Sequence, residues 1–89
     1  MLNTSNISEL SKILNEKILN IKSVAGGDIA ASYFLETKTR QIFLKTHPKN
    51  SLLKAEKYGL NLISRTKTIA TPKIIAFGRL NTISFLALE

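Results

Sequence analysis

The stretch Ile42–Ile63, IFLKTHPKNSLLKAEKYGLNLI, decides the fold of this chain. Its first six residues, Ile42–His47, are mostly apolar and predict a short strand with Lys45 near its end. Pro48 and Asn50 interrupt that pattern. The residues that follow have helical periodicity, which predicts a helix over Ser51–Ser64.

Glu56 has an unusual position in the predicted helix. On a helical wheel it falls in the middle of an apolar stripe formed by Leu52, Leu53, Gly59, Leu60 and Ile63. The opposite side carries Lys54, Lys57, Asn61 and Ser64. A carboxylate that faces a core without a partner is costly, so Glu56 should pair with a cation. Lys45, on the preceding strand, is the nearest candidate in the sequence.

The rest of the chain supplies further short elements. Ser5–Ile18 is predicted as a helix capped by Ser5 or Asn6, with Ile7, Leu10, Leu14 and Ile18 on one face. Strands are predicted at Asn20–Ala25, Ala31–Thr37, Lys73–Phe77 and Ile83–Leu88, with a turn at Gly78–Thr82. The links between consecutive strands are short, which favours antiparallel pairing. We therefore expect an α+β fold, a five-stranded antiparallel sheet with a helix before it and a helix between strands three and four.

Length and composition limit the function classes. Eighty-nine residues make one small domain, and 44% hydrophobic content is typical of a folded chain. The absence of cysteine excludes disulfides, thiolate zinc sites and a cysteine nucleophile. The first residues lack the layout of a signal peptide, and no apolar run is long enough for a membrane span. The expectation is a cytoplasmic protein that does not associate with a membrane.

The net charge of +7 raises the alternative of a small nucleic-acid binder. The thirteen Lys and Arg residues are spread along the chain, however, and no two of them are adjacent. No aromatic platform motif lies among them. A solvated basic surface, with no nucleic-acid partner, explains the charge better.

With the elements in this order, the chain resembles the fructosamine kinase (ketosamine kinase) family, whose fold is that of the protein kinases and aminoglycoside phosphotransferases. The resemblance covers about residues 7–89. It rests on a glycine-containing loop, a lysine strand, an acidic helix and the last two strands: Val24–Ile29, Phe43–Lys45, Leu52–Leu60, Ser64–Thr68 with Thr71–Ile75, and Ser84–Glu89. It implies that residues 20–89 are a kinase-like N-lobe preceded by a helical segment at residues 1–19.

The chain departs from the family's pattern at two places. Some members have a cysteine in the phosphate loop that permits redox-linked dimers, and here that position is Asp28. The chain also stops at Glu89, before the second lobe that carries the catalytic and metal-binding aspartates of the family. The expectation is an isolated N-lobe with no catalytic and no metal-binding residue of its own.

The resemblance implies roles for the residues around the phosphates of ATP. Lys45 would bridge the α- and β-phosphates, and Glu56 would hold its ammonium in place. Gly26 and Gly27 would let the backbone approach a phosphate, whereas Asp28 would shape the turn. The structural alternatives are an ion pair without a ligand and an ordinary glycine hairpin.

The resemblance also suggests an adenine site. Phe43 shares a strand face with Lys45 and could line it, and Leu88 and Glu89 would lie at the hinge between the lobes. Core packing is the competing explanation for Phe43, Leu88 and Glu89. His47 is interpreted as a loop histidine. The remaining aromatic residues considered, Tyr33, Phe34, Phe77 and Phe85, are predicted to lie in the core.

Two functions follow as hypotheses. The first is the ATP-binding N-lobe of a ketosamine kinase, which with Mg²⁺ would phosphorylate the sugar part of a glycated small molecule or protein in the intact enzyme. The 89 residues alone would then be inactive. The alternative is a truncated, non-enzymatic module that forms a homo-oligomer through its exposed apolar face and through an unprotected edge of the last strand.

Overall fold

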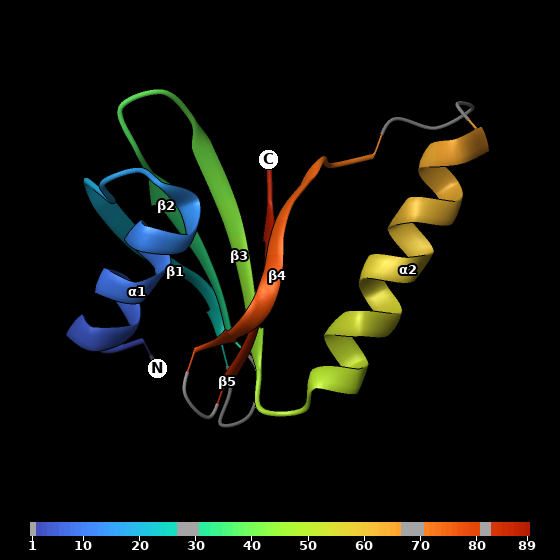
Figure 1. The fold of residues 1–89 in the computed structure, drawn as a ribbon, viewed down its shortest axis with the longest axis horizontal. Coiled ribbons are helices and arrows are strands. Elements are labelled where there is room, and N and C mark those ends of the chain that lie inside the picture. The colour runs from blue at the N-terminus through green and yellow to red at the C-terminus, as the bar shows by residue number, and fades with distance from the viewer. Residues whose placement is uncertain (1, 27–30, 67–70, 81–82) are drawn as a thin grey trace.

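The computed structural model describes residues 2–26, 31–66, 71–80 and 83–89 and contains two helices and five strands there. Figure 1 shows the sheet between the two helices. The elements are α1 (Thr4–Leu14), β1 (Asn20–Gly26), β2 (Ala31–Glu36), β3 (Gln41–His47), α2 (Asn50–Thr66), β4 (Ile74–Leu80) and β5 (Ile83–Leu88). Among the described residues, neither helix is long and apolar enough to cross a membrane.

The sheet has the strand order β1-β2-β3-β5-β4, and every neighbouring pair is antiparallel. The predicted α+β fold, with five antiparallel strands and helices before and after the first three of them, is confirmed. The expected edge position of the last strand is wrong. Leu88 of β5 is opposite Phe43 of β3 on one side and opposite Ile74 of β4 on the other, so β5 is an interior strand. The sheet edges are β1 and β4.

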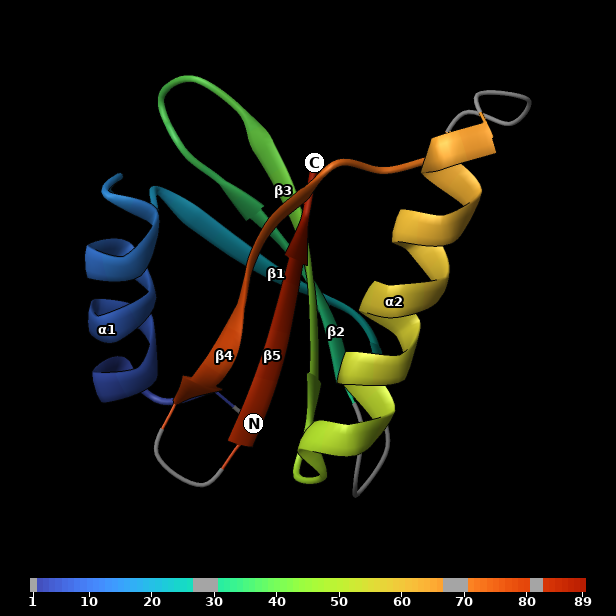
Figure 2. The same ribbon diagram turned by 45° about the vertical axis from the view of Figure 1, so that its right-hand side comes forward.

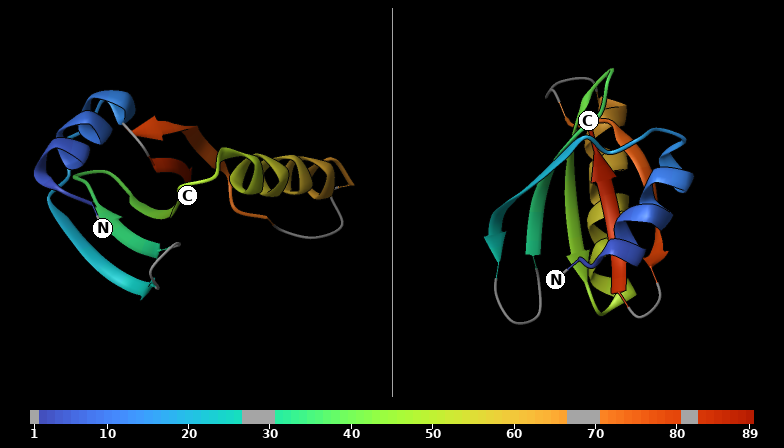
Figure 3. Two further views of the ribbon diagram at one scale, coloured as in Figure 1. Left: turned by 90° about the horizontal axis from the view of Figure 1, so that it is seen from below. Right: turned by 90° about the vertical axis from the view of Figure 1, so that its left-hand side faces the viewer.

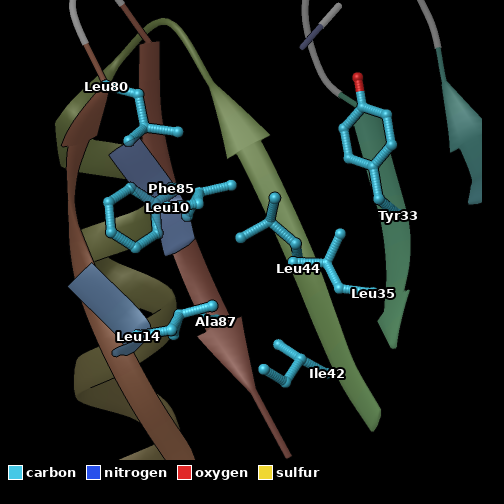
Figure 4. Close-up of a cluster of buried hydrophobic side chains, with 9 residues drawn as sticks. All are labelled: Leu10, Leu14, Tyr33, Leu35, Ile42, Leu44, Leu80, Phe85 and Ala87. Carbon is cyan, nitrogen blue, oxygen red and sulfur yellow. The ribbon is translucent and has the colours of Figure 1, made fainter. Parts of the chain in front are cut away.

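One face of the sheet packs against α1 and forms the larger core. The buried side chains of this core come from α1 and from four strands, as Figure 4 shows: Leu10, Leu14, Tyr33, Leu35, Ile42, Leu44, Leu80, Phe85 and Ala87. Alternate residues of a strand point to the same face, and on β3 Ile42 and Leu44 are both fully buried on the α1 side.

Helix α1 begins and ends earlier than predicted. Its cap is Asn3, whose side chain accepts the amide N–H of Asn6 while the Asn6 side chain accepts that of Asn3. The helix ends at Leu14 because Asn15 adopts the left-handed conformation, with φ of 56°, and its N–H bonds back to the Lys12 carbonyl. Asparagine tolerates this conformation better than most residues.

Helix α2 lies on the opposite face of the sheet and packs there less extensively. Leu53 is its buried residue, and Leu60 packs beside it against Leu86 and Leu88 of β5. The helix contacts the sheet near its N-terminal end and diverges from it toward its C-terminal end (Figures 1 and 2). Seen from below, it extends away from the sheet (Figure 3, left).

Strand β4 continues through residues that were predicted to form a turn. Gly78, placed in that turn by its residue type, is opposite Phe85 in the β4–β5 ladder. A Cβ at position 78 would lie 3.3 Å from the Phe85 ring. The glycine therefore makes room for a buried ring within the strand and does not end it.

Phe34 is not the core residue that was predicted. Tyr33 and Phe34 are consecutive in β2, so they point to opposite faces of the sheet. Tyr33 is buried on the α1 face, whereas Phe34 is 49% exposed on the α2 face. Phe77 also lies on the α2 face and is half-buried, and of the four aromatic residues only Tyr33 and Phe85 belong to the larger core.

Candidate functional site

The central feature of the α2 face is an ion pair between Lys45 and Glu56. The ammonium of Lys45, on β3, lies 2.7 Å from a carboxylate oxygen of Glu56, on α2. About a third of each side chain is exposed, 36% for Lys45 and 35% for Glu56. The ion pair expected from the sequence is therefore present, between the strand and the helix that were predicted.

The surroundings of Glu56 differ from those expected. Leu52 and Ile63, which flank it on the helical wheel, are 53% and 41% exposed. The helix is rotated so that Leu53 and Leu60 point at the sheet, and Glu56 lies at the border of this contact. The carboxylate is therefore accessible to solvent and to a ligand, not enclosed in a core.

Lys57 falls opposite the apolar stripe on the helical wheel, yet in the structure it contacts the sheet. Its side chain is half-buried, and its ammonium lies 5.2 Å from the centre of the Phe77 ring on β4. The sequence did contain the signal, because Leu53, Lys57 and Leu60 follow the 4-3 spacing of one helical face.

A cavity of about 250 Å³ opens beside the ion pair. It is lined by residues of β2, β3 and the first turns of α2: Ala31, Ser32, Lys45, Thr46, His47, Leu52, Leu53 and Glu56. His47 is the last residue of β3, not a loop residue, and its Nδ1 accepts the amide N–H of Lys49 at 2.9 Å. The cavity thus offers one oriented ammonium to an anionic ligand.

Two aromatic rings lie next to Lys45 on the same face. Phe34 and Phe43 are opposite each other in the β2–β3 ladder, and their rings meet edge to face at 5.4 Å. The Lys45 ammonium is 6.0 Å from the centre of the Phe43 ring. Phe43 is half-buried and Phe34 is 49% exposed, so the pair presents a partly accessible apolar surface.

The other predicted site residues are placed as follows. Leu88 is opposite Phe43 and buried at 5% exposure, and Glu89 follows it as an exposed residue. Gly26 ends β1 opposite Ala31 of β2. Gly27 and Asp28 lie outside the residues that the structure describes.

Glu89 also belongs to a polar network that the sequence did not reveal. Its carboxylate lies 3.6 Å from Arg40, and the Arg40 guanidinium contacts the Glu16 carboxylate at 2.6 Å. The hydroxyls of Thr37 and Thr39 donate to Glu16 at 2.7 Å and 2.6 Å. The hydrogen bonds from Thr39 and Thr37, together with Arg40, hold the pKa of Glu16 below its usual value.

The described residues offer no obvious metal site. No three of their histidine, aspartate and glutamate side chains gather in a way that could hold a metal ion. The chemistry available at this face is therefore the positioning of an anion by Lys45 next to an aromatic surface.

Comparison with known proteins gives a consistent result. The family model described as "Fructosamine kinase" matches residues 2–89. A curated relative, the "Probable ketoamine kinase" of Lactiplantibacillus plantarum, is 35% identical over 74 residues, which are 81% of this chain and 26% of the relative. The chain thus spans about a quarter of that relative's length.

A solved structure shows the same fold. The crystal structure of a "Putative fructosamine-3-kinase" from Haemophilus somnus 129PT superimposes with a TM-score of 0.79 at 23% identity. The match covers 90% of this chain and 30% of the other.

Proposed function

The chain belongs to the fructosamine kinase family, and from this premise we propose that it is the ATP-binding lobe of a ketosamine kinase. The intact enzyme transfers the γ-phosphoryl group of ATP to a hydroxyl on the sugar part of a glycated amine. Acceptors of this class are glycated small molecules or glycated proteins.

The observation that carries the proposal is the Lys45–Glu56 ion pair between β3 and α2. In kinases of this fold, a strand lysine and a helix glutamate position the phosphates of ATP. The 2.7 Å contact fixes the direction of the Lys45 ammonium, and its partial exposure leaves donor capacity for phosphate oxygens. In this proposal Lys45 bridges the α- and β-phosphates, and Glu56 keeps it in place.

The neighbouring residues fit the remaining parts of ATP. The cavity beside Lys45 receives the phosphates, and Gly26, which ends β1 opposite the cavity residue Ala31, would let the backbone approach them. Phe43 lies two residues before Lys45 on the same face of β3, opposite Leu88 of β5, and provides an apolar wall for adenine. The N–H of Glu89 already donates to the Lys73 carbonyl at 2.8 Å, so we assign recognition of the adenine edge to the other backbone groups of Leu88 and Glu89.

Other parts of the reaction need groups that the described residues do not offer. Mg²⁺ requires oxygen ligands, and among the described residues no such cluster exists. We place the metal ligands and the base that activates the acceptor hydroxyl in the portion of the relatives that this chain does not match.

ATP binding to the 89-residue chain tests the proposal. We expect measurable heat on titration with ATP, and a dissociation constant that rises about tenfold or more in Lys45→Met, because a charge-assisted hydrogen bond is lost. Glu56→Gln should raise it by a smaller factor, since the lysine remains. Lys54→Met is the matched control, because Lys54 is an exposed lysine of α2, the helix that carries Glu56. Equal affinities of the unmodified chain and Lys45→Met would refute the assignment.

A further inference from the structure

Two consecutive residues of α2 contact strands on opposite sides of β5. The helix packs over β5 through Leu53 and Leu60. From this position Glu56 reaches Lys45 on β3, and Lys57 reaches Phe77 on β4. Because β5 lies between β3 and β4, the two contacts stand on either side of the helix axis.

Apolar packing alone does not fix the rotation of α2. Leu53 is the buried residue of the helix, and residues 61–66 are all exposed. Leu52, Leu62 and Ile63, which a differently rotated helix would turn toward the sheet, are between 41% and 53% exposed. The helix therefore keeps a second apolar side away from the sheet, and contacts beside the packing of Leu53 and Leu60 can help to select the observed rotation.

The Lys57–Phe77 contact is suited to this selection. An ammonium is attracted to the face of an aromatic ring, and the attraction is stronger where water is partly excluded. Lys57 is half-buried although it lies on a solvent-accessible helix, and its stem covers part of the apolar surface. A rotation of α2 that exposed Lys57 would break this contact and move Glu56 at the same time.

We propose that Lys57 is a positioning residue that sets the rotation of α2 through the Phe77 ring and thereby presents Glu56 to Lys45. The inference rests on the proposed function only for its consequence in ATP binding. The effect on the Lys45–Glu56 ion pair is a property of the folded chain without nucleotide.

The test measures how fast the Lys45 amine is acylated, in the full 89-residue chain and without ATP. An amine-directed acylating reagent is added, and the rate at Lys45 is followed by mass spectrometry of peptides and normalised to Lys22. The Glu56 carboxylate holds the Lys45 ammonium at 2.7 Å and restricts the approach of the reagent to it, so loss of the ion pair should speed acylation. Glu56→Gln removes the ion pair and defines the full increase in the acylation rate of Lys45, about two- to fivefold for a pair of this exposure.

Lys57→Glu should raise the Lys45 rate by at least half of that effect, because a carboxylate is repelled by the ring face. Phe77→Leu, which keeps an apolar side chain, should act in the same direction, and adding it to Lys57→Glu should have no further effect. Lys57→Arg keeps a cation and should restore the original rate. Lys54→Glu is the matched control, with the same charge change on the exposed side of α2, and should leave the rate unchanged.

If Lys57→Glu and Lys54→Glu give the same rate at Lys45, or if Phe77→Leu has no effect, the positioning role is refuted. Titration of the same variants with ATP forms a second arm, in which Lys57→Glu weakens binding and Lys57→Arg does not. Absence of ATP binding to the unmodified chain would refute the proposed function and leave the acylation result to judge Lys57.

Discussion

At the residue scale, Glu16 connects segments that are far apart in the sequence. Its carboxylate accepts hydrogen bonds from Thr37 and Thr39 and pairs with Arg40, so the segment after α1 is joined to the turn between β2 and β3. Arg40 extends the connection to Glu89. The position of the chain at the end of β5 thus depends in part on the charge of Glu16.

This charge predicts a pH dependence of stability. The pKa of Glu16 is lowered in the folded state, first by the hydrogen bonds from Thr39 and Thr37 and then by Arg40. Its contribution is therefore complete above the unfolded value of 4.5 and is lost as the pH falls through the lower, folded value. We expect the melting temperature to fall between about pH 6 and pH 3, and Glu16→Gln to flatten that decline. The measurement is thermal unfolding followed by circular dichroism.

Glu36→Gln is the control for this prediction, because Glu36 is an exposed glutamate of β2. It should leave the slope of melting temperature against pH unchanged between about pH 6 and pH 3. An unchanged slope in Glu16→Gln would show that the network does not contribute to acid sensitivity.

The residues that could be predicted from the sequence are those whose partners lie nearby in the chain. The Lys45–Glu56 pair was predictable because strand and helix are consecutive and the helical phase places Glu56 among apolar residues, although the structure puts it at the border of the contact with the sheet. The Glu16 network joins residues more than twenty positions apart, and nothing in the local pattern of Glu16 indicates its partners. Phe34 was misplaced because its residue type was given more weight than the alternation of the strand.

At the element scale, the number, order and type of the elements were predictable, and some of their ends and one orientation were not. Alternating and helical patterns identify elements well. The end of α1 depends on the left-handed conformation of Asn15, and the length of β4 depends on a cross-strand contact of Gly78. The rotation of α2 was misjudged because two apolar sides compete, and only the sheet determines which one is used.

The two glycines inside elements should respond oppositely to the same change. Gly59 lies within α2, and a Cβ there would meet nothing within 4 Å, so Gly59→Ala should stabilise the chain by about 0.5–1 kcal/mol through helix propensity. Gly78→Ala should destabilise it by about 1 kcal/mol or more, because the new methyl group presses on Phe85, which is 1% exposed and enclosed by the core. Urea unfolding of both variants gives the comparison. Equal shifts in the same direction would contradict this account of Gly78.

At the scale of the whole molecule, the two faces of the sheet differ in their degree of packing. The α1 face has a continuous core of nine buried side chains. The α2 face has a smaller cluster, in which Leu53, Leu86 and Leu88 are buried, and next to it lie the half-exposed Phe43, Lys45 and Glu56. The better-packed α1 face thus supports a more open face on which Lys45 and Glu56 are partly exposed.

The functional groups on the α2 face predict what these 89 residues do by themselves. In the proposed function Lys45 and Glu56 orient the phosphates, but phosphoryl transfer also requires a group that positions the acceptor hydroxyl and ligands for the metal ion. Among the described residues no cluster of acidic and histidine side chains could hold that ion. We therefore expect the chain to bind ATP without transferring its γ-phosphoryl group to a glycated amine. Phosphorus NMR of ATP, Mg²⁺ and a fructosyl amine with the purified chain measures this directly, with the Lactiplantibacillus plantarum relative as a comparison. Turnover that depends on the glycated amine and disappears in Lys45→Met would show that the 89 residues contain a complete active site.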